Sequence, residues 1–136
     1  MNEPREILFR GKRKDNGEWI YGSLVKYYYK SFIVPDNVDY TYMLHTMFQE
    51  AREVDPKTVG QYTGLNDVSG RKIFEGDILS VLYASIENGS FFEHMDVYYE
   101  LDYAQYYVGY RELYEVSNNS EVIGNIHDNP ELLEVK

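Results

Sequence analysis

The stretch at residues 54–79, with the sequence VDPKTVGQYTGLNDVSGRKIFEGDIL, constrains the fold more than any other part of the chain. Four glycines divide it into short apolar pieces: Gly60, Gly64, Gly70 and Gly76. Glycine adopts the left-handed backbone that tight turns need and that other residues avoid. Short apolar segments between such turns are typical of β-structure, so we predict strands at residues 59–63 and 78–83.

Two aspartates in this stretch lie where their side chains are expected to hold turns. Asp55 precedes Pro56, which predicts one short helical turn in which the Asp55 carboxylate accepts the amide of Thr58. Asp77 comes just before an aliphatic strand, so we expect its carboxylate to accept backbone amides of the turn. The alternative is that Glu75 and Asp77 act as an acid and base pair, which requires burial to raise one pKa.

A β-hairpin is predicted near the N-terminus by the turn sequence DNG at residues 15–17, because asparagine and glycine tolerate left-handed backbone geometry. The returning strand, residues 18–29, carries apolar side chains on both faces, with Trp19 on one and Ile20 on the other. Such a strand is expected to be central in a sheet or covered on both sides.

Residues 38–53 are ambiguous. Their helical stripe consists of Leu44, Met47, Phe48 and Ala51. We favour the alternative of a strand at residues 49–54, because the neighbouring segments are strands.

The second half of the chain is expected to continue as strands. Residues 97–103 alternate like a strand with one wetter face, and residues 110–116 are predicted to return beside them after a reversal near Gly109. Residues 122–126 form the last predicted strand. At the end, we expect Asn129 to cap a short helical turn that begins at Pro130.

Length and composition set bounds on architecture and location. At 136 residues the chain is within the usual size of one domain, so we predict a single domain over residues 1–136. It has no cysteine, which excludes disulfides and thiolate metal sites. No stretch nears the roughly 20 apolar residues of a membrane span, so we expect a cytoplasmic protein without a membrane partner.

The sequence carries no recognised enzyme chemistry. His45, His94 and His127 lie far apart without metal-binding spacing, so we expect no metal site. The glycine-rich phosphate-binding motifs and the GxSxG nucleophile motif are missing. We therefore predict a non-enzymatic protein with no catalytic residues and no cofactor.

A basic run in the N-terminal hairpin is the candidate nucleic-acid site. Its members are Arg10, Lys12, Arg13 and Lys14. Cations beside aromatic rings such as Trp19 suit a single strand of DNA or RNA. The alternative is a solvated hairpin tip that pairs with acidic strands. The net charge of −10 disfavours nucleic acid, although residues 1–30 carry a balance of +3.

Tyrosine is abundant, with fifteen residues in the chain, and seven of them lie among acidic side chains in residues 91–116. Tyrosine adds contact area at low entropic cost, and carboxylates around it suit a basic protein partner. The candidate protein-contact residues are Tyr98, Tyr106 and Tyr110. The alternative is a cross-strand tyrosine ladder that fills a thin sheet.

Four motifs in order, FRGKRKDNGEWIYG, VDPKTVGQYTGL, IFEGDIL and EVIGNIHDNPELLE, span nearly the whole chain. Together they resemble the YopX family, whose members are encoded mostly by bacteriophages and prophages. The resemblance implies a mostly β domain, a phage or prophage origin and expression inside a bacterial cell. It implies no established activity and no catalytic residues.

The combined prediction is a mainly β chain, between all-β and α+β. We expect small barrel-like or strongly bent antiparallel sheets, an N-terminal hairpin and a short C-terminal helical turn. The functional prediction is a non-enzymatic protein-interaction module that binds a protein partner or itself as a homo-oligomer. The alternative is a single-stranded nucleic-acid-binding protein that uses the basic hairpin.

Overall fold

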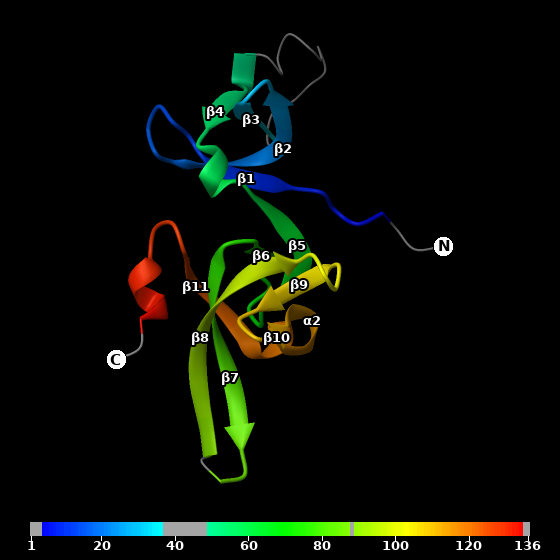
Figure 1. Cartoon of the computed structure of the whole chain (residues 1–136), viewed down its shortest axis with the longest axis vertical. Coiled ribbons are helices and arrows are strands. Elements are labelled where there is room, and N and C mark those ends of the chain that lie inside the picture. The colour runs from blue at the N-terminus through cyan, green and yellow to red at the C-terminus, as the bar shows by residue number, and fades with distance from the viewer. Residues whose placement is uncertain (1–3, 37–48, 88, 135–136) are drawn as a thin grey trace. The chain divides into compact units, whose positions relative to one another are not determined.

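The computed structural model describes residues 4–36, 49–87 and 89–134, and the chain divides into two compact units, Met1–Tyr62 and Thr63–Lys136. Figure 1 shows that both units are built mainly from strands. The prediction of a mainly β fold is therefore confirmed. Whether the two units behave as the predicted single domain stays a prediction.

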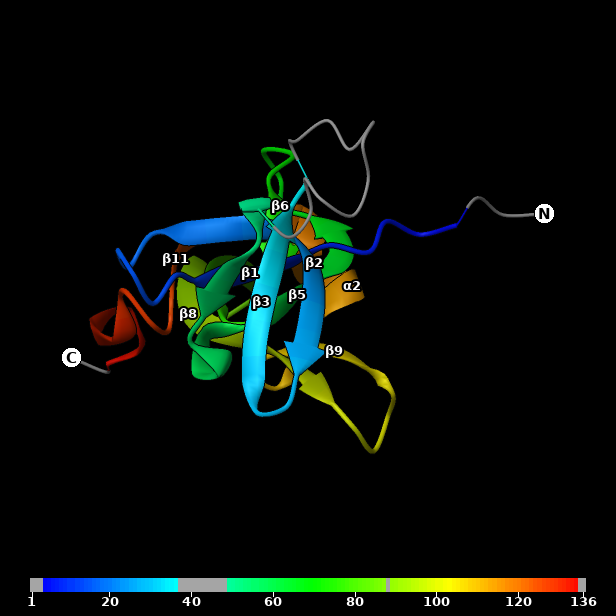
Figure 2. The ribbon, with the colours of Figure 1, turned by 90° about the horizontal axis from the view of Figure 1, so that it is seen from above.

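The first unit holds antiparallel strands in the order β4-β3-β2-β1-β5. Their bounds are β1 (Phe9–Lys12), β2 (Trp19–Tyr27), β3 (Lys30–Pro35), β4 (Arg52–Val54) and β5 (Gly60–Asn66), of which β5 continues into the second unit. Figure 2 shows β2 and β3 side by side as a hairpin. Strand β2 lies between β1 and β3, which confirms its predicted central position.

This sheet is strongly bent. An isolated bridge joins Arg13 to Val54, and the Lys14 amide donates to the Glu53 carbonyl at 3.0 Å, so β4 returns to the end of β1. The described strands do not close into a barrel, so the bent-sheet form of the prediction is the one confirmed. Of the strand predicted at residues 49–54, only Arg52–Val54 forms, as β4, whereas residues 49 and 50 are helical, so that part of the prediction is wrong. Leu44, Met47 and Phe48 lie outside the described residues.

The turn that joins β1 to β2 forms as predicted. The Glu18 amide donates to the Asn16 side chain at 2.9 Å, and Gly17 has a φ of 73°. Since the hydrogen bond joins residues two apart and the φ belongs to the residue between them, the sequence alone is enough to specify the turn.

The predicted helical turn after Asp55 is a 3₁₀ turn, η1 (Pro56–Thr58). The Asp55 carboxylate accepts the amide of Lys57 at 3.0 Å rather than that of Thr58, because the Thr58 amide donates to the Asp55 carbonyl at 2.9 Å. The Thr58 hydroxyl accepts from the Lys12 amide at 2.8 Å. This bond fastens the turn to β1, and it joins residues 46 positions apart.

The second unit holds a sheet with the order β10-β9-β8-β7-β11, in which every pair is antiparallel. The bounds of these five strands are β7 (Asp77–Ser85), β8 (Gly89–Glu100), β9 (Gln105–Val108), β10 (Arg111–Glu112) and β11 (Ser120–Asn125). The unit also contains β6 (Lys72–Phe74), which pairs with β5 instead. The helical elements are α2 (Leu113–Val116), η2 (Ser117–Asn119) and η3 (Pro130–Leu133).

The predicted returning strand at residues 110–116 is wrong beyond Glu112. Gly109 does mark the reversal, but Leu113 and Val116 lie on one face of α2 and are both buried. Residues three apart share a helix face and take opposite faces in a strand, so burying both favours the helix.

The core of the second unit is aliphatic. It contains Ile73, Leu79, Val81, Met95, Val97, Val108, Leu113, Val116 and Val122. Each fully buried aliphatic side chain contributes roughly 1.5–3 kcal/mol relative to an exposed one. Residues 97 and 108 pair directly across β8 and β9, so the register of this pair sets which tyrosines face the core.

Two buried carboxylates hold the turns of the second unit. Asp77 accepts the Phe74 amide at 2.7 Å, which confirms its predicted structural role. Asp67 accepts the amides of Ser69, Arg71 and Val122, each at 2.9 Å. The bond to Val122 joins the turn before β6 to β11, 55 residues further along the chain.

Asn129 precedes η3, but it does not cap it with its side chain as predicted. Its side-chain oxygen instead accepts the amide of Asn125 at 3.2 Å. Gly124 allows this approach, because a Cβ atom there would lie 2.6 Å from the same oxygen. The predicted C-terminal helical turn is present as η3.

Candidate functional site

The two units differ in charge. Residues 1–62 contain nine acidic and nine basic side chains, whereas residues 63–136 contain 14 acidic and four basic ones. The second unit therefore carries the whole net charge of −10. A field of one sign attracts oppositely charged partners and speeds their association.

The hairpin of β8 and β9 places tyrosines opposite one another. Tyr98 pairs with Tyr107 and Tyr99 pairs with Tyr106. Successive residues of a strand point to opposite faces, so the first pair and the second pair lie on different faces of the hairpin. Because Val97 and Val108 are buried and adjoin Tyr98 and Tyr107, the Tyr98 pair faces outward.

We call Tyr98, Tyr103 and Tyr107 the tyrosine face. The ring of Tyr107 lies 6.1 Å from that of Tyr98 and 5.9 Å from that of Tyr103. Tyr98 is 37% and Tyr103 67% exposed. The Tyr98 hydroxyl donates to the Gly109 carbonyl at 2.8 Å, which holds its ring in place.

Carboxylates lie close to the tyrosine face. Burial raises the pKa of Tyr98, and the nearby charges of Glu100 and Asp96 raise it further. The Asp102 amide donates to the Glu100 carboxylate at 3.2 Å, which keeps Glu100 at the end of the hairpin. The face thus combines neutral phenols with a negative border.

Tyr106 lies on the other side of the hairpin. Its ring meets that of Tyr99 edge to face at 5.1 Å, and it packs against the aliphatic core. Its side chain is therefore part of the support for the sheet.

Tyr110 occupies a third place, in the turn between β9 and β10. Its ring stacks on Tyr83 at 6.5 Å, and its hydroxyl donates to the Glu93 carboxylate at 3.0 Å. The Arg111 guanidinium also lies over the Tyr83 ring, 5.2 Å from its centre. The three residues chosen from the sequence, Tyr98, Tyr106 and Tyr110, therefore do not share one surface.

Raising the pH should weaken the Tyr110 contact. The neighbouring Tyr83 hydroxyl and the hydrogen bond to Glu93 raise the pKa of Tyr110 from 10.0 to about 12. Since the protonated hydroxyl is the form that donates, the stabilisation is complete below pH 10 and is lost as the pH rises towards 12. Subtracting the phenolate absorbance of Tyr110→Phe from that of the wild type should show one tyrosine still protonated at about pH 11. In Glu93→Gln its pKa should fall towards 10, and a wild-type midpoint at 10 would contradict the contact.

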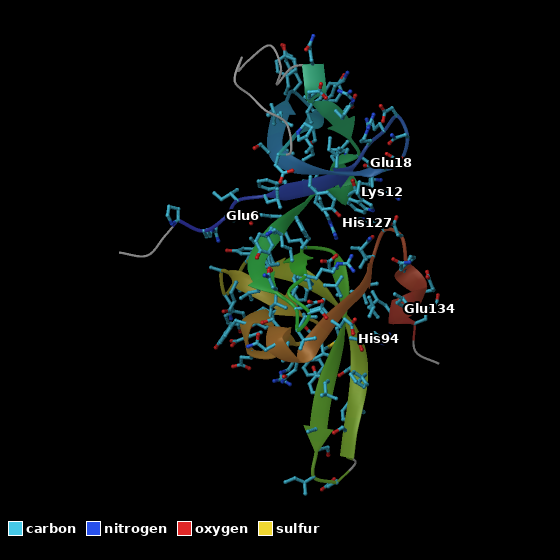
Figure 3. All side chains as sticks on the ribbon, turned by 180° about the vertical axis from the view of Figure 1, so that it is seen from behind. Glu6, Lys12, Glu18, His94, His127 and Glu134 are labelled. Atoms are coloured by element: carbon cyan, nitrogen blue, oxygen red, sulfur yellow. The ribbon has the colours of Figure 1, made fainter. Side chains whose placement is uncertain are left out.

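The four basic residues of the N-terminal hairpin do not converge on one exposed surface. Arg10 is only 4% exposed and lies over the Trp19 ring at 4.7 Å, and the Lys12 ammonium lies 5.8 Å from the same ring. Figure 3 shows Lys12 at this hairpin.

The other two cations are paired with carboxylates. Arg13 contacts Asp15 at 2.6 Å, and this hydrogen bond lowers the pKa of Asp15. Lys14 contacts Glu53 of β4 at 3.0 Å. Cations engaged in this way have less charge to offer phosphates. No observation favours the nucleic-acid hypothesis, which stays a prediction.

A groove between β8 and η3 was not predicted. It has a volume of about 800 Å³ and is lined by Phe92, Glu93, His94, Glu131, Leu132, Leu133 and Glu134. The Nδ1 atom of His94 lies 3.2 Å from the Leu132 carbonyl oxygen, which ties η3 to β8. Figure 3 shows His94 on β8 and Glu134 directly after η3. Sequence reasoning missed this groove because its walls lie about 40 residues apart.

Two features are absent from the described residues, 4–36, 49–87 and 89–134. These residues contain no group of three acidic, histidine or cysteine side chains able to hold a metal ion. None of their helices is both long and apolar enough to cross a membrane.

Comparison with known proteins is consistent with the motifs. The family described as YopX protein matches residues 8–134. The chain belongs to the YopX family. The structure of this YopX-family chain is similar to the crystal structure of protein EF1440 from Enterococcus faecalis, with a TM-score of 0.61 and 23% sequence identity. The match covers 96% of this chain and 100% of that one, and at this identity it shows the fold alone. Comparison with curated protein sequences gives no match.

Proposed function

We propose that this YopX-family protein is a non-enzymatic interaction module, and that its second unit binds a basic protein partner through the tyrosine face. The observation that carries the proposal is the pair of exposed rings, Tyr98 and Tyr103, that both pack on the half-buried Tyr107 within a unit of charge −10. Aromatic residues supply much of the energy of protein interfaces, and charge complementarity supplies rate and specificity.

The three rings are suited to binding because they are already ordered. Tyr98 is fixed by its bond to Gly109, and Tyr107 contacts both of the other rings. A partner that covers them therefore immobilises little additional freedom. Glu100 and Asp96, beside Tyr98, favour lysine or arginine side chains at the edge of the contact.

The test compares two tyrosines of equal exposure in the two units. Tyr103→Ala, at 67% exposure, should weaken capture of the bacterial partner on the order of 30-fold, the effect of losing about 2 kcal/mol at an interface. Tyr27→Ala, at 63% exposure in the first unit, whose net charge is zero, is the matched control and should leave capture unchanged. The measurement is quantitative pull-down from lysates of bacteria that carry the phage or prophage, followed by titration of the captured protein.

Salt provides a second readout. Binding of a basic partner should weaken as ionic strength rises, because exposed charges are screened within about 10 Å at 0.1 M salt. Equal capture by the wild type and Tyr103→Ala, or capture that does not respond to salt, would count against the tyrosine face as the site.

A further inference from the structure

The strand β8 has a free edge beside the groove that it forms with η3. Between residues 91 and 95 it pairs with β7 on one side, and none of the described strands pairs with its other side, because β9 begins to pair only at Val97. Figure 1 shows η3 on the side of β8 that faces away from β7, and residues 92–94 line the groove. A free edge presents a row of backbone N–H and C=O groups to which a further strand can add.

The opposite wall of the groove, η3, is held in place by its own hydrogen bonds. The Leu132 amide donates to the Asn129 carbonyl at 3.1 Å. The Glu134 amide donates to the Glu131 carbonyl, also at 3.1 Å. The contact of His94 with the Leu132 carbonyl then ties this wall to β8. Binding a chain in the groove therefore costs little free energy for ordering the wall.

The two faces of the free edge differ in chemistry. Successive residues of a strand point to opposite faces, so Phe92 lies on one face and Glu93 on the other. The side chains of Leu132 and Leu133 line the groove together with Phe92. Glu93 accepts a hydrogen bond from the Tyr110 hydroxyl at 3.0 Å, which fixes the carboxylate and leaves its charge in place. A strand added to this edge therefore meets an apolar surface on one face and a carboxylate on the other.

Charge selects the kind of chain that fits. Three glutamates line the groove, Glu93, Glu131 and Glu134, and none of the described lining residues is lysine or arginine. An acidic chain, including a second copy of this unit with its charge of −10, is repelled by these carboxylates, whereas lysine and arginine side chains are attracted. An extended chain in which basic and apolar residues alternate satisfies both the edge and the lining.

We propose that the groove binds an extended segment of another protein, in which basic residues alternate with apolar ones, and that this segment adds as a strand to the free edge of β8. Backbone hydrogen bonds with residues 91–95 supply affinity, and the alternate side chains supply specificity. The apolar side chains of the segment pack against Phe92 and Leu133, and its basic side chains lie near Glu93. This site is separate from the tyrosine face, and neither site requires the other.

Binding of synthetic peptides to the full chain tests the proposal. The probe is a short, fluorescently labelled peptide, capped at both ends, in which lysine alternates with valine. Its affinity is measured by fluorescence anisotropy at about 0.15 M salt, which screens exposed charges beyond roughly 8 Å. A glutamate–valine peptide should bind more weakly on the order of tenfold or more, because like charges then meet in the groove. The lysine–valine peptide with every backbone amide N-methylated should lose a similar factor, since it has no donor for the edge.

Two pairs of substitutions locate the site. Glu131→Gln combined with Glu134→Gln removes two charges from the groove and should weaken binding of the lysine–valine peptide on the order of fivefold, since each exposed ion pair contributes modestly. Glu100→Gln combined with Asp102→Asn removes the same charge beside the tyrosine face and should leave the affinity unchanged. All four replacements keep the shape of the side chain, so the fold should persist.

Hydrogen exchange locates the contact on the backbone. Some amides of residues 91–95 point away from β7, and these should exchange more slowly once the lysine–valine peptide is bound, because they gain acceptors. Amides of residues 98–107, which carry the tyrosine face, should exchange at the same rate with and without the peptide.

Three results would overturn the proposal. The first is equal affinity for the lysine–valine and glutamate–valine peptides, or no binding of either at millimolar concentration. The second is an equal effect of the groove pair and the tyrosine-face pair of substitutions. The third is protection of the free edge in the protein alone that grows with its own concentration, which would assign the edge to a second copy. Peptide binding that survives Tyr103→Ala while capture of the basic partner is lost would separate this site from the tyrosine face.

Discussion

Gly22→Ala is expected to lower the free energy of unfolding by about 4 kcal/mol or more, which places it among the most damaging single substitutions in the first unit. A Cβ atom at this position would lie 1.8 Å from the carbonyl oxygen of Val34 and 2.7 Å from its carbonyl carbon. Both atoms belong to the backbone of β3, so relief requires β2 and β3 to separate. That separation breaks a pairing that runs from Gly22↔Pro35 to Tyr27↔Lys30.

The matched control is another glycine in the same unit. Gly17 has a φ of 73° and no atom within 4 Å of an added Cβ, so Gly17→Ala should cost only about 1 kcal/mol of backbone strain. Chemical unfolding followed by the fluorescence of Trp19, the single tryptophan of the chain, measures both variants. Equal midpoints for the two would show that β2 and β3 do not approach as closely as the structure has them.

Asp67→Ala should have the second largest effect, a loss of about 4 kcal/mol of stability in the second unit. The carboxylate is 5% exposed and accepts three backbone amides, so its removal leaves Ser69, Arg71 and Val122 without their acceptor. A hydrogen bond to a charged group contributes roughly 1.5–3 kcal/mol, and water that enters the new space recovers part of the sum.

The destabilisation by Asp67→Ala should be largest near the amides that lose their acceptor, which hydrogen exchange can measure. Hydrogen exchange at the Val122 amide should accelerate more than exchange at amides near the tyrosine face, because Val122 loses its acceptor directly. Asp67→Asn retains one acceptor oxygen and should fall between the wild type and Asp67→Ala. Asp102→Ala, at an exposed position, should change stability by less than about 0.5 kcal/mol, and a similar loss there would indicate a general charge effect instead.

The parts of the fold that were predictable are those whose contacts are local. The turn at Asn16 and Gly17, the turn after Asp55 and the role of Asp77 each depend on groups two or three residues apart. Their geometry follows from the side chains in the turn itself. The four motifs, which span nearly the whole chain, are runs of sequence, so they were enough to recognise the YopX family.

The helix α2 shows where pattern alone failed. Residues 110–116 have the aromatic and apolar content of a strand, and two of them do form β10. Burial of Leu113 and Val116 on one side of the chain then favours the helix, and that burial exists only because the core of the second unit is assembled beside them.

The tyrosines show the same limit at the candidate site. Composition indicated residues 91–116 as a contact region, but it did not separate Tyr98 from Tyr106. The pairing register of β8 and β9 decides which face of the hairpin each tyrosine takes, since a shift of one residue moves every side chain to the other face. Tyr103 and Tyr107 join Tyr98 because the hairpin brings their rings within about 6 Å.

The amino-acid sequence by itself determined that this chain is rich in strands, where its tight turns fall and that its charge is acidic, because these properties depend on each residue and its near neighbours. Only the tertiary structure decided which strands pair, which tyrosines face outward, that Lys14 meets Glu53 and that a groove forms between β8 and η3. Each of these outcomes depends on contacts between residues far apart in the chain. Such contacts form only when the strands pair in the register that buries their aliphatic side chains.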